Sequence, residues 1–237
     1  MRRISFAILF LTLLNNSIFP HSSSNNKDST TTNLYIGINT GLVYSKFISN
    51  STFPIFGPYN NALFNFVGGI NLTYYFNETL SIETGINYLK TGSKTEESSG
   101  TDELGNIQGK FWFKQSLEYI ELPLLVKYSF HNKRIEPYIT SGPNFGIILS
   151  GEDKIEADYT LNENQKYKKD IKNELNTLNI SFGLGSGINY HLKENFIISL
   201  KIIFFIGFND QIKNDKVNGH QKSQNIRLIF SFQKILF

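Results

Sequence analysis

Few side chains in this sequence are of the kind that carry out catalysis. It contains four histidines and no cysteine, which excludes a disulfide, a thiolate metal site and a lipid-modified cysteine. Acid–base or nucleophilic catalysis would need a histidine beside a serine, or beside an acid that activates water. Of the four, His220 lies in a long polar stretch beside Asp215 and Lys216, and an enzymatic function would depend on it.

The other three histidines lack such surroundings. His21 lies in a polar N-terminal stretch, and His131 and His191 lie in short predicted turns. The glycines of residues 183–187 alternate along a strand instead of joining a strand to a helix, so they do not form a phosphate-binding loop. We therefore predict no catalytic site, no cofactor and no metal site, and interpret the protein as a non-enzyme.

A second informative set consists of charged side chains within alternating segments. It comprises Glu83, Glu121, Lys127, Lys201 and Arg227. Each lies on the polar face of a segment whose other face is apolar, and an unpaired charge in a narrow interior is costly, so we expect these residues to pair across a barrel. Glu121 and Lys127 lie about 20 Å apart along one strand and need partners on other strands. We predict a structural charge network, with a lining that selects solutes as the alternative.

The elements that must hold these side chains are β-strands. In residues 34–44, Leu34 and Ile36 lie on one face, and Gly37 and Asn39 lie on the other. One apolar and one small, polar face suits a strand between lipid and a polar interior. Eight such segments follow one another, at 34–44, 64–76, 80–88, 119–128, 136–150, 178–190, 196–208 and 225–233.

The connections between these segments alternate in length. Short turns are predicted at 77–78, 131–134 and 191–195, and long polar loops at 46–62, 91–114, 151–175 and 209–223. Transmembrane barrels have short periplasmic turns and longer external loops. The sequence therefore predicts an all-β, eight-stranded antiparallel up-and-down transmembrane β-barrel with both termini in the periplasm. A short extension or helix is expected within 151–175.

Two segments depart from the regular pattern. The segment 136–150 contains Pro137, Gly142 and Pro143, and proline in a strand marks an edge or a bulge. Because a closed barrel has no edge, bulges are expected there. In the last segment the outward register runs through Phe232 to Lys234, which leaves Phe237 on the other face. Either a bulge lies near 233–234, or Phe232 ends the membrane segment.

The N-terminus resembles an export signal. Two arginines precede an apolar run at 4–14, which is too short for a transmembrane helix. We expect a signal peptide over 1–20, a polar linker over 21–32 and the barrel domain over 33–237. With 23 basic and 20 acidic residues, nothing favours a nucleic-acid partner. A soluble, lipocalin-like barrel with its apolar face inward shares the alternation, but the signal, the loop lengths and the aromatic residues at strand ends favour a membrane.

Residues 119–128 read YIELPLLVKY, and residues 137–143 read PYITSGP. This pattern resembles the PorT-like outer-membrane β-barrel family of Bacteroidetes, in which a Tyr-x-Glu-x-Pro-Leu-Leu-x-Lys-Tyr strand precedes a Pro-Tyr-x-x-x-Gly-Pro strand. The resemblance spans roughly 33–237. It implies a protein of the Gram-negative outer membrane whose name-giving relative assists protein secretion.

Together these observations predict a structural or interaction protein of the cell envelope. The expected partners are outer-membrane lipid and lipopolysaccharide, the outer-membrane assembly machinery, and envelope or secretion proteins. A narrow channel for small solutes is the alternative, and an outer-membrane enzyme acting on lipid or peptide is less favoured. Eight strands favour a filled interior over an open pore.

Overall fold

The computed structural model describes residues 33–49, 61–96, 98–101, 107–130, 134–159, 165–193, 195–213 and 220–236. The predicted signal peptide and linker lie outside the described residues. The elements are β1 (Asn33–Ser49), β2 (Asn61–Tyr75), β3 (Leu80–Lys94), β4 (Ser98–Thr101), β5 (Ile107–Ser129), β6 (Ile135–Tyr159), β7 (Gln165–Asp170), the 3-10 turn η1 (Lys172–Glu174), β8 (Leu178–Lys193), β9 (Phe196–Gly207) and β10 (Gln221–Ile235).

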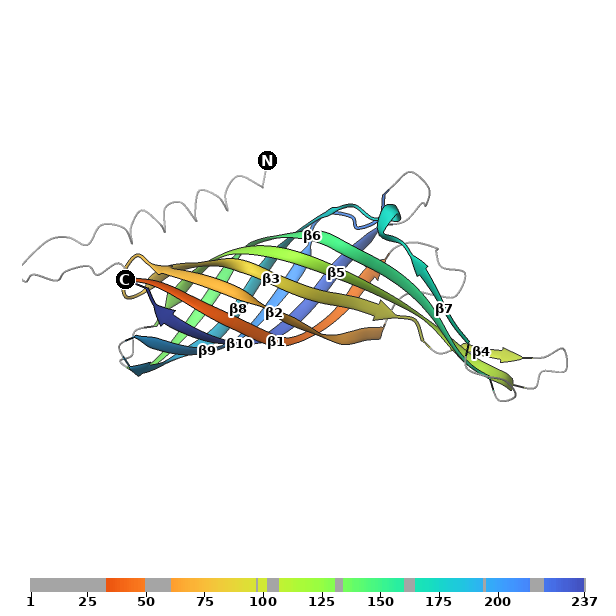
Figure 1. Cartoon of the computed structure of the whole chain (residues 1–237), viewed down its shortest axis with the longest axis horizontal. Coiled ribbons are helices and arrows are strands. Elements are labelled where there is room, and N and C mark those ends of the chain that lie inside the picture. Colours follow the sequence, from red (N-terminus) through yellow and green to blue (C-terminus); the bar gives the residue numbers. More distant parts are fainter. Residues whose placement is uncertain are drawn as a thin grey trace, which may run out of the picture. The chain divides into compact units, whose positions relative to one another are not determined.

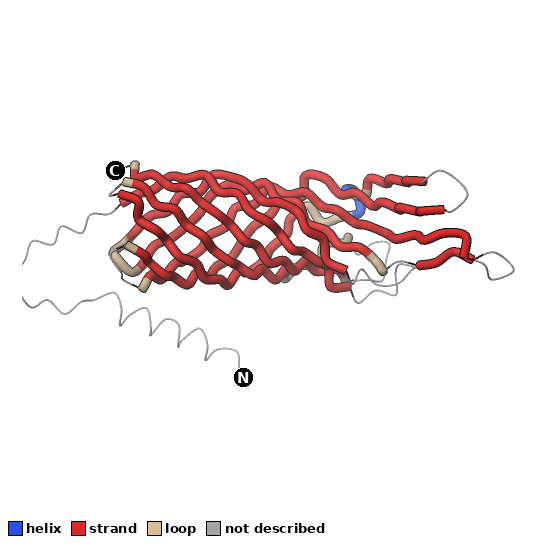
Figure 2. Tube along the Cα trace, turned by 90° about the horizontal axis from the view of Figure 1, so that it is seen from below, coloured by secondary structure: helices blue, strands red, loops and turns tan. Residues whose placement is uncertain are grey.

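Eight of these strands form a closed ring. Its order is β5-β3-β2-β1-β10-β9-β8-β6, and pairing between β6 and β5 closes it. Every pairing is antiparallel, and the first strand pairs with the last, from Tyr35↔Ile235 to Ser49↔Gln221. Figures 1 and 2 show the tilted strands winding around the ring. The predicted eight-stranded up-and-down barrel is confirmed.

The apolar face of the strands points outward. Ile38 is 66 % exposed and Phe64 75 %, whereas Tyr35 and Val43 on the opposite face of β1 are buried. A soluble barrel would bury its apolar face inside, so the lipocalin-like alternative is wrong. No helix in the described ranges is long and apolar enough to cross a membrane.

Aromatic pairs border the apolar band at both ends. Tyr74 packs on Phe76 near the short turns, and Phe66 packs on Tyr88 near the long loops. Such rings suit the two interfaces of a bilayer, where one edge of a ring meets polar groups. We call the two ends of the barrel the turn end and the loop end. At the turn end the Asn77 side chain accepts hydrogen bonds from the backbone of Leu80 and from Thr79, which fixes the β2–β3 turn.

Strands reach into all four predicted loops. β5 has 23 residues and β6 has 25, whereas about 9–11 residues suffice to cross a bilayer. Beyond the membrane both faces of a strand meet water, so the alternation that marks a strand in the sequence fades while backbone pairing continues. We call residues 107–117 and 150–159, with β4 and β7 on their edges, the extension; Figure 1 shows it projecting at the loop end.

The predicted bulges at the prolines of β6 are wrong. Pro137 and Pro143 stay in continuous register with β8. The register with β5 is also the same on both sides of the Leu124 region. Proline removes one donor without adding a residue, and Gly142 permits the tight approach there, since a Cβ would lie 2.0 Å from the Leu124 carbonyl oxygen. The register between β5 and β6 shifts instead between Glu118 and Tyr119.

The last strand contains no bulge near residues 233–234. Its register with β1 is unbroken, with Phe232 opposite Ile38 and Lys234 opposite Ile36. Lys234 therefore follows Phe232 on the outer face, and its ammonium lies 5.9 Å from the centre of the Phe196 ring. Phe237 lies outside the described residues.

Candidate functional site: the filled lumen

All five predicted charged residues point into the lumen and are buried. Their exposed fractions lie between 1 % and 4 %. β3 supplies Glu83, β5 supplies Glu121 and Lys127, β9 supplies Lys201, and β10 supplies Arg227. Inward placement follows from strand parity, because side chains alternate between the two faces. The neighbours on both sides of Glu121, Lys127, Lys201 and Arg227 are exposed apolar residues.

One cluster joins three of these residues towards the turn end. Lys127 Nζ lies 3.5 Å from Glu83 Oε2, and Lys201 pairs with the other oxygen of the same carboxylate. The Lys127 ammonium also lies 4.2 Å from the centre of the Tyr138 ring. The Tyr138 hydroxyl is 2.8 Å from the Ser199 hydroxyl. One carboxylate thus serves two ammonium groups, and an aromatic ring gives a further favourable contact.

The second cluster lies further along the barrel. Both terminal nitrogens of Arg227 donate to the Glu121 carboxylate, at 2.6 and 3.1 Å, and its Nε donates to Asn225 at 2.6 Å. The guanidinium carbon lies 4.1 Å from the centre of the Phe205 ring. This planar, bidentate arrangement satisfies both charges where water is absent. Glu121 and Lys127 therefore have separate partners on other strands.

A further acid at the turn end escaped the sequence analysis. Glu136 of β6 accepts hydrogen bonds from Ser129 at 2.5 Å and Asn189 at 3.0 Å, and lies 2.8 Å from His191 Nε2. Glu136 lies two residues before Tyr138 and therefore on the same face of the strand, and this spacing could have identified it as an inward-facing acid. His191, predicted in a turn, lies at the end of β8 instead.

The order of contacts in this cluster differs from that of a catalytic triad. In a triad the imidazole lies between the nucleophile and the acid, so that it takes up the proton of the nucleophile. Here the Glu136 carboxylate lies between Ser129 and His191. The group is built to hold the acid in place.

A cluster of apolar side chains extends along the lumen among buried polar ones, from the level of Glu83 and Lys201, which pair with Leu125 and Ile229, to the loop end. The buried cluster comprises Val43, Phe47, Val67, Leu89, Leu117, Tyr119, Leu125, Ile148, Ile171, Leu175, Ile203, Phe205 and Ile229. Two of its members, Ile171 and Leu175, come from outside the strands, next to η1. No periodicity marks these two residues in the sequence, so strand patterns could not predict that they enter the lumen.

Two chain segments form a cap at the loop end, and we use that word for residues 171–177 and 208–213. Leu175 pairs with Ile212 in an isolated bridge. The Asn176 side chain donates to the carbonyls of Asp210 and Ile212, at 2.9 and 3.1 Å. Gln211 is 1 % exposed and donates to the Tyr119 hydroxyl at 2.8 Å. The cap is thus fastened to the apolar part of the lumen.

His220 contacts the cap. Its Nδ1 lies 2.5 Å from Asp210, whose carboxylate also accepts from the backbone of Gln221 at 2.8 Å. Burial acts to raise the pKa of Asp210, but the hydrogen bonds from Gln221 and His220 prevail and lower it. Asp215 and Lys216, which were predicted to lie beside His220, are outside the described residues. His21 and His131 are outside them as well.

The sequence matches the outer membrane protein β-barrel domain family over residues 15–213. This chain belongs to that family. Its outward apolar face and aromatic borders are those of a protein of the outer membrane, where the family places it. No curated protein sequence matches the chain.

Several solved outer-membrane barrels are similar to this family member at low identity. OprG of Pseudomonas aeruginosa is 12 % identical with a TM-score of 0.44, over 86 % of this chain and 96 % of OprG. Escherichia coli outer membrane protein W is 14 % identical with a TM-score of 0.44, over 87 % and 98 %. The E. coli outer membrane protease OmpT is 9 % identical with a TM-score of 0.40, over 91 % and 100 %.

No group of three or more His, Cys, Asp or Glu residues that could hold a metal ion occurs among the described residues. The site is a stack of two ion-pair clusters, an apolar cluster and a cap.

Proposed function

We propose that this outer-membrane barrel is a closed, non-enzymatic protein with a structural or interaction role in the cell envelope. The observation that carries the proposal is the filled lumen. Arg227 and Glu121 are 2 % and 1 % exposed and held by two hydrogen bonds, and apolar side chains fill the space above them. A closed interior leaves the outer surfaces for function.

The loop end is the surface that this proposal favours. There β5 and β6 continue well past the bilayer length, with β4 and β7 added at their edges. Short turns at one end and long projections at the other suit a barrel with periplasmic turns and external loops. We place both termini in the periplasm and the extension outside the cell. Partners would be envelope or secretion proteins, in addition to lipopolysaccharide and the assembly machinery.

The pattern shared with the PorT-like barrels of Bacteroidetes supports a role that assists protein secretion. The YIELPLLVKY segment forms the turn-end half of β5, and its Glu121 and Lys127 serve the two ion-pair clusters. In this interpretation the residues of this segment stabilise the barrel, and the specific partner is recognised elsewhere. Deletion of the gene should then impair export of a subset of secreted proteins, with no loss of a hydrolytic activity.

The contacts of the histidines support the non-enzymatic part of the proposal. Within the described part of the chain, His191 contacts Glu136 and His220 contacts Asp210, and neither hydrogen-bonds to a hydroxyl nucleophile. If His220 with Asp210 activated water, substitution of His220 by alanine would abolish a lipid- or peptide-cleaving activity. We expect the wild-type protein to cleave neither lipid nor peptide.

Single-channel recording in planar bilayers tests the closed lumen. The refolded full-length protein is expected to give no stable conductance steps above those of protein-free membranes. Reproducible steps of one size would instead support the alternative, a narrow channel for small solutes. Heat-dependent migration on SDS gels serves as the folding control, because folded outer-membrane barrels resist SDS until boiled.

A further inference from the structure

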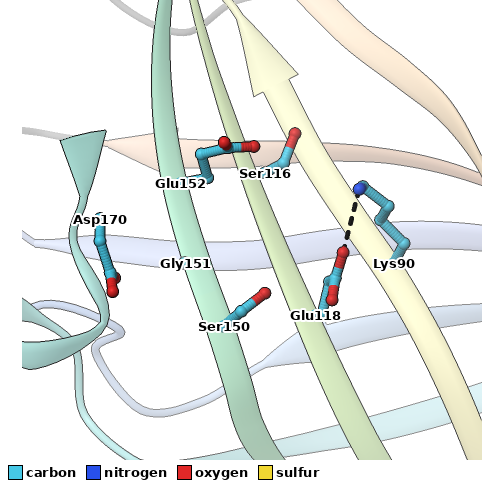
Figure 3. A pocket seen from close by; sticks show the side chains of 7 residues that line it. All are labelled: Lys90, Ser116, Glu118, Ser150, Gly151, Glu152 and Asp170. Carbon is cyan, nitrogen blue, oxygen red and sulfur yellow. Dashed lines mark hydrogen bonds and ion pairs between the residues drawn. The ribbon is translucent and has the colours of Figure 1, made fainter. Parts of the chain in front are cut away.

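Three strands and the end of β7 enclose a small polar pocket on the outer face of the barrel. Its volume is about 290 Å³. It is lined by Lys90 of β3, Ser116 and Glu118 of β5, Ser150, Gly151 and Glu152 of β6, and Asp170 of β7 (Figure 3). We propose that this pocket binds a single neutral sugar ring, of the kind carried by glycolipid headgroups.

The pocket begins where the apolar band ends. Tyr88 and Ile120 are opposite one another on β3 and β5, and the next outward pair is Lys90 opposite Glu118. These two are the first charged residues above the aromatic border, at the depth of the polar headgroups. The proposed orientation places this edge in the outer leaflet, and the assignment to an outer-leaflet lipid rests on that proposed function.

Most of the carboxylates in the pocket are already held by lysines. Lys90 donates to Glu118 at 3.0 Å. Lys154 and Lys168 lie 2.9 and 2.8 Å from the two oxygens of Glu152. The walls are therefore fixed and nearly neutral, and they still present oxygens with unused lone pairs.

Two groups remain available to a ligand. Ser116 is only 5 % exposed, and its hydroxyl makes no hydrogen bond to any residue that the structure describes. Figure 3 shows this hydroxyl between the carboxylate of Glu152 and the ammonium of Lys90. Asp170 uses one oxygen to accept from the Lys172 backbone at 2.9 Å, which leaves the other oxygen open. The Ser116 hydroxyl lines the pocket, where it can both donate to and accept from a bound group.

The chemistry of the lining selects among ligands. Lys90, the cation of the lining, is already paired with Glu118, and Asp170 has no lysine partner in the described ranges, so the lining does not favour a phosphate. No metal-binding group of acids and histidines occurs within these ranges. A sugar ring presents hydroxyls that both donate and accept, which matches a lining of carboxylates, serine hydroxyls and one ammonium. The volume is at the small end of ligand pockets, so it suits one ring and not an oligosaccharide.

Native mass spectrometry of the full-length protein in detergent tests the proposal. The probes are a monoglucosyl diacylglycerol, whose headgroup is one neutral sugar ring, free glucose, and phosphatidylethanolamine, which has no sugar. Ser116→Val removes the hydroxyl and Asp170→Ala removes the free carboxylate oxygen, so each is expected to weaken sugar binding about five- to tenfold. Ser186→Ala, on the exposed outer face of β8, is the matched control and should bind as wild type does.

The possible outcomes distinguish a glycolipid headgroup from a soluble sugar, and both of these from a pocket that binds no sugar. Binding of the lipid but not the free sugar, weakened by both variants, assigns a glycolipid headgroup; equal binding of the free sugar assigns a soluble ligand. Unchanged binding in both variants, no binding of either sugar probe, or equal binding of phosphatidylethanolamine would overturn the proposal. In detergent the protein has no orientation in a membrane, and binding is measured without recording conductance. The result therefore does not depend on whether the lumen is closed. Heat-dependent gel migration confirms that each variant is folded.

Discussion

The two halves of the lumen are closed by different physical means. Towards the turn end the interior is polar, and Glu83 and Glu136 hold lysines, hydroxyls and a histidine. Towards the loop end an apolar cluster packs beside uncharged polar side chains, and the cap covers it with Leu175 and Gln211. Charge pairs need every partner in place, whereas an apolar cluster tolerates small changes in shape. The polar half should therefore respond sharply to single substitutions, and the apolar half gradually.

Removal of one partner from the Arg227–Glu121 pair tests the sharp response. Arg227→Ala leaves the Glu121 carboxylate buried without its two hydrogen bonds. We expect the free energy of unfolding to fall by about 3–5 kcal/mol. Urea unfolding in lipid vesicles, followed by tryptophan fluorescence, measures it.

A double variant provides the matched comparison. Glu121→Gln with Arg227→Met removes both charges and keeps the volume, so it should lose far less stability than Arg227→Ala alone. If the single and the double variant lost equal stability, the charges would not be the cause. A conductance that appears only in Arg227→Ala would show that this pair also closes the lumen.

The cap provides the gradual response. Leu175→Ala removes a side chain that is 2 % exposed and packs in the apolar cluster. The expected loss is about 2–3 kcal/mol, because the loss of the buried methyl groups is partly relieved when the loop settles into the space. Hydrogen exchange should rise at the backbone amide of Asn176, which donates to the Gln211 carbonyl across the cap, and at that of Gln211, which donates to the Gln221 carbonyl. Unchanged exchange there would show that Leu175 does not hold the cap.

The extension contains a buried acid that opposes folding at neutral pH. Burial raises the pKa of Asp153 to about 6 from 3.8. Because the folded state holds this proton more tightly than the unfolded state, Asp153 contributes stability below pH 3.8 that is lost as the pH rises through about 6.

Asp153→Asn should therefore stabilise the protein at pH 7 by about 1–3 kcal/mol. The same substitution should have little effect at pH 3.5. Urea midpoints of both proteins at the two pH values test this. A variant that is less stable than wild type at pH 7 would show that the ionised carboxylate is used by a partner in the fold.

The sequence predicted the membrane-embedded part of the molecule far better than the loop end. Glu83 and Arg227 were identifiable because each lies on the polar face of a period-two pattern whose other face is apolar. Leu175 and Gln211 gave no such signal, because their burial depends on two loops meeting over the barrel. Ser116 was missed because its strand lies beyond the bilayer, where water contacts both faces and the alternation disappears.

An exposed ion pair at the loop end is expected to have the smallest effect. Lys169 and Glu174 lie 2.7 Å apart, but their side chains are 53 % and 55 % exposed. Glu174→Gln removes the charge and keeps the shape, so stability should change by less than about 1 kcal/mol, and the change should disappear in high salt. Unfolding midpoints at low and high salt measure this. A loss of stability as large as that of Arg227→Ala would mean that burial does not explain the strength of the Arg227–Glu121 pair. The contrast between buried and exposed charge would then no longer explain the stability of this barrel.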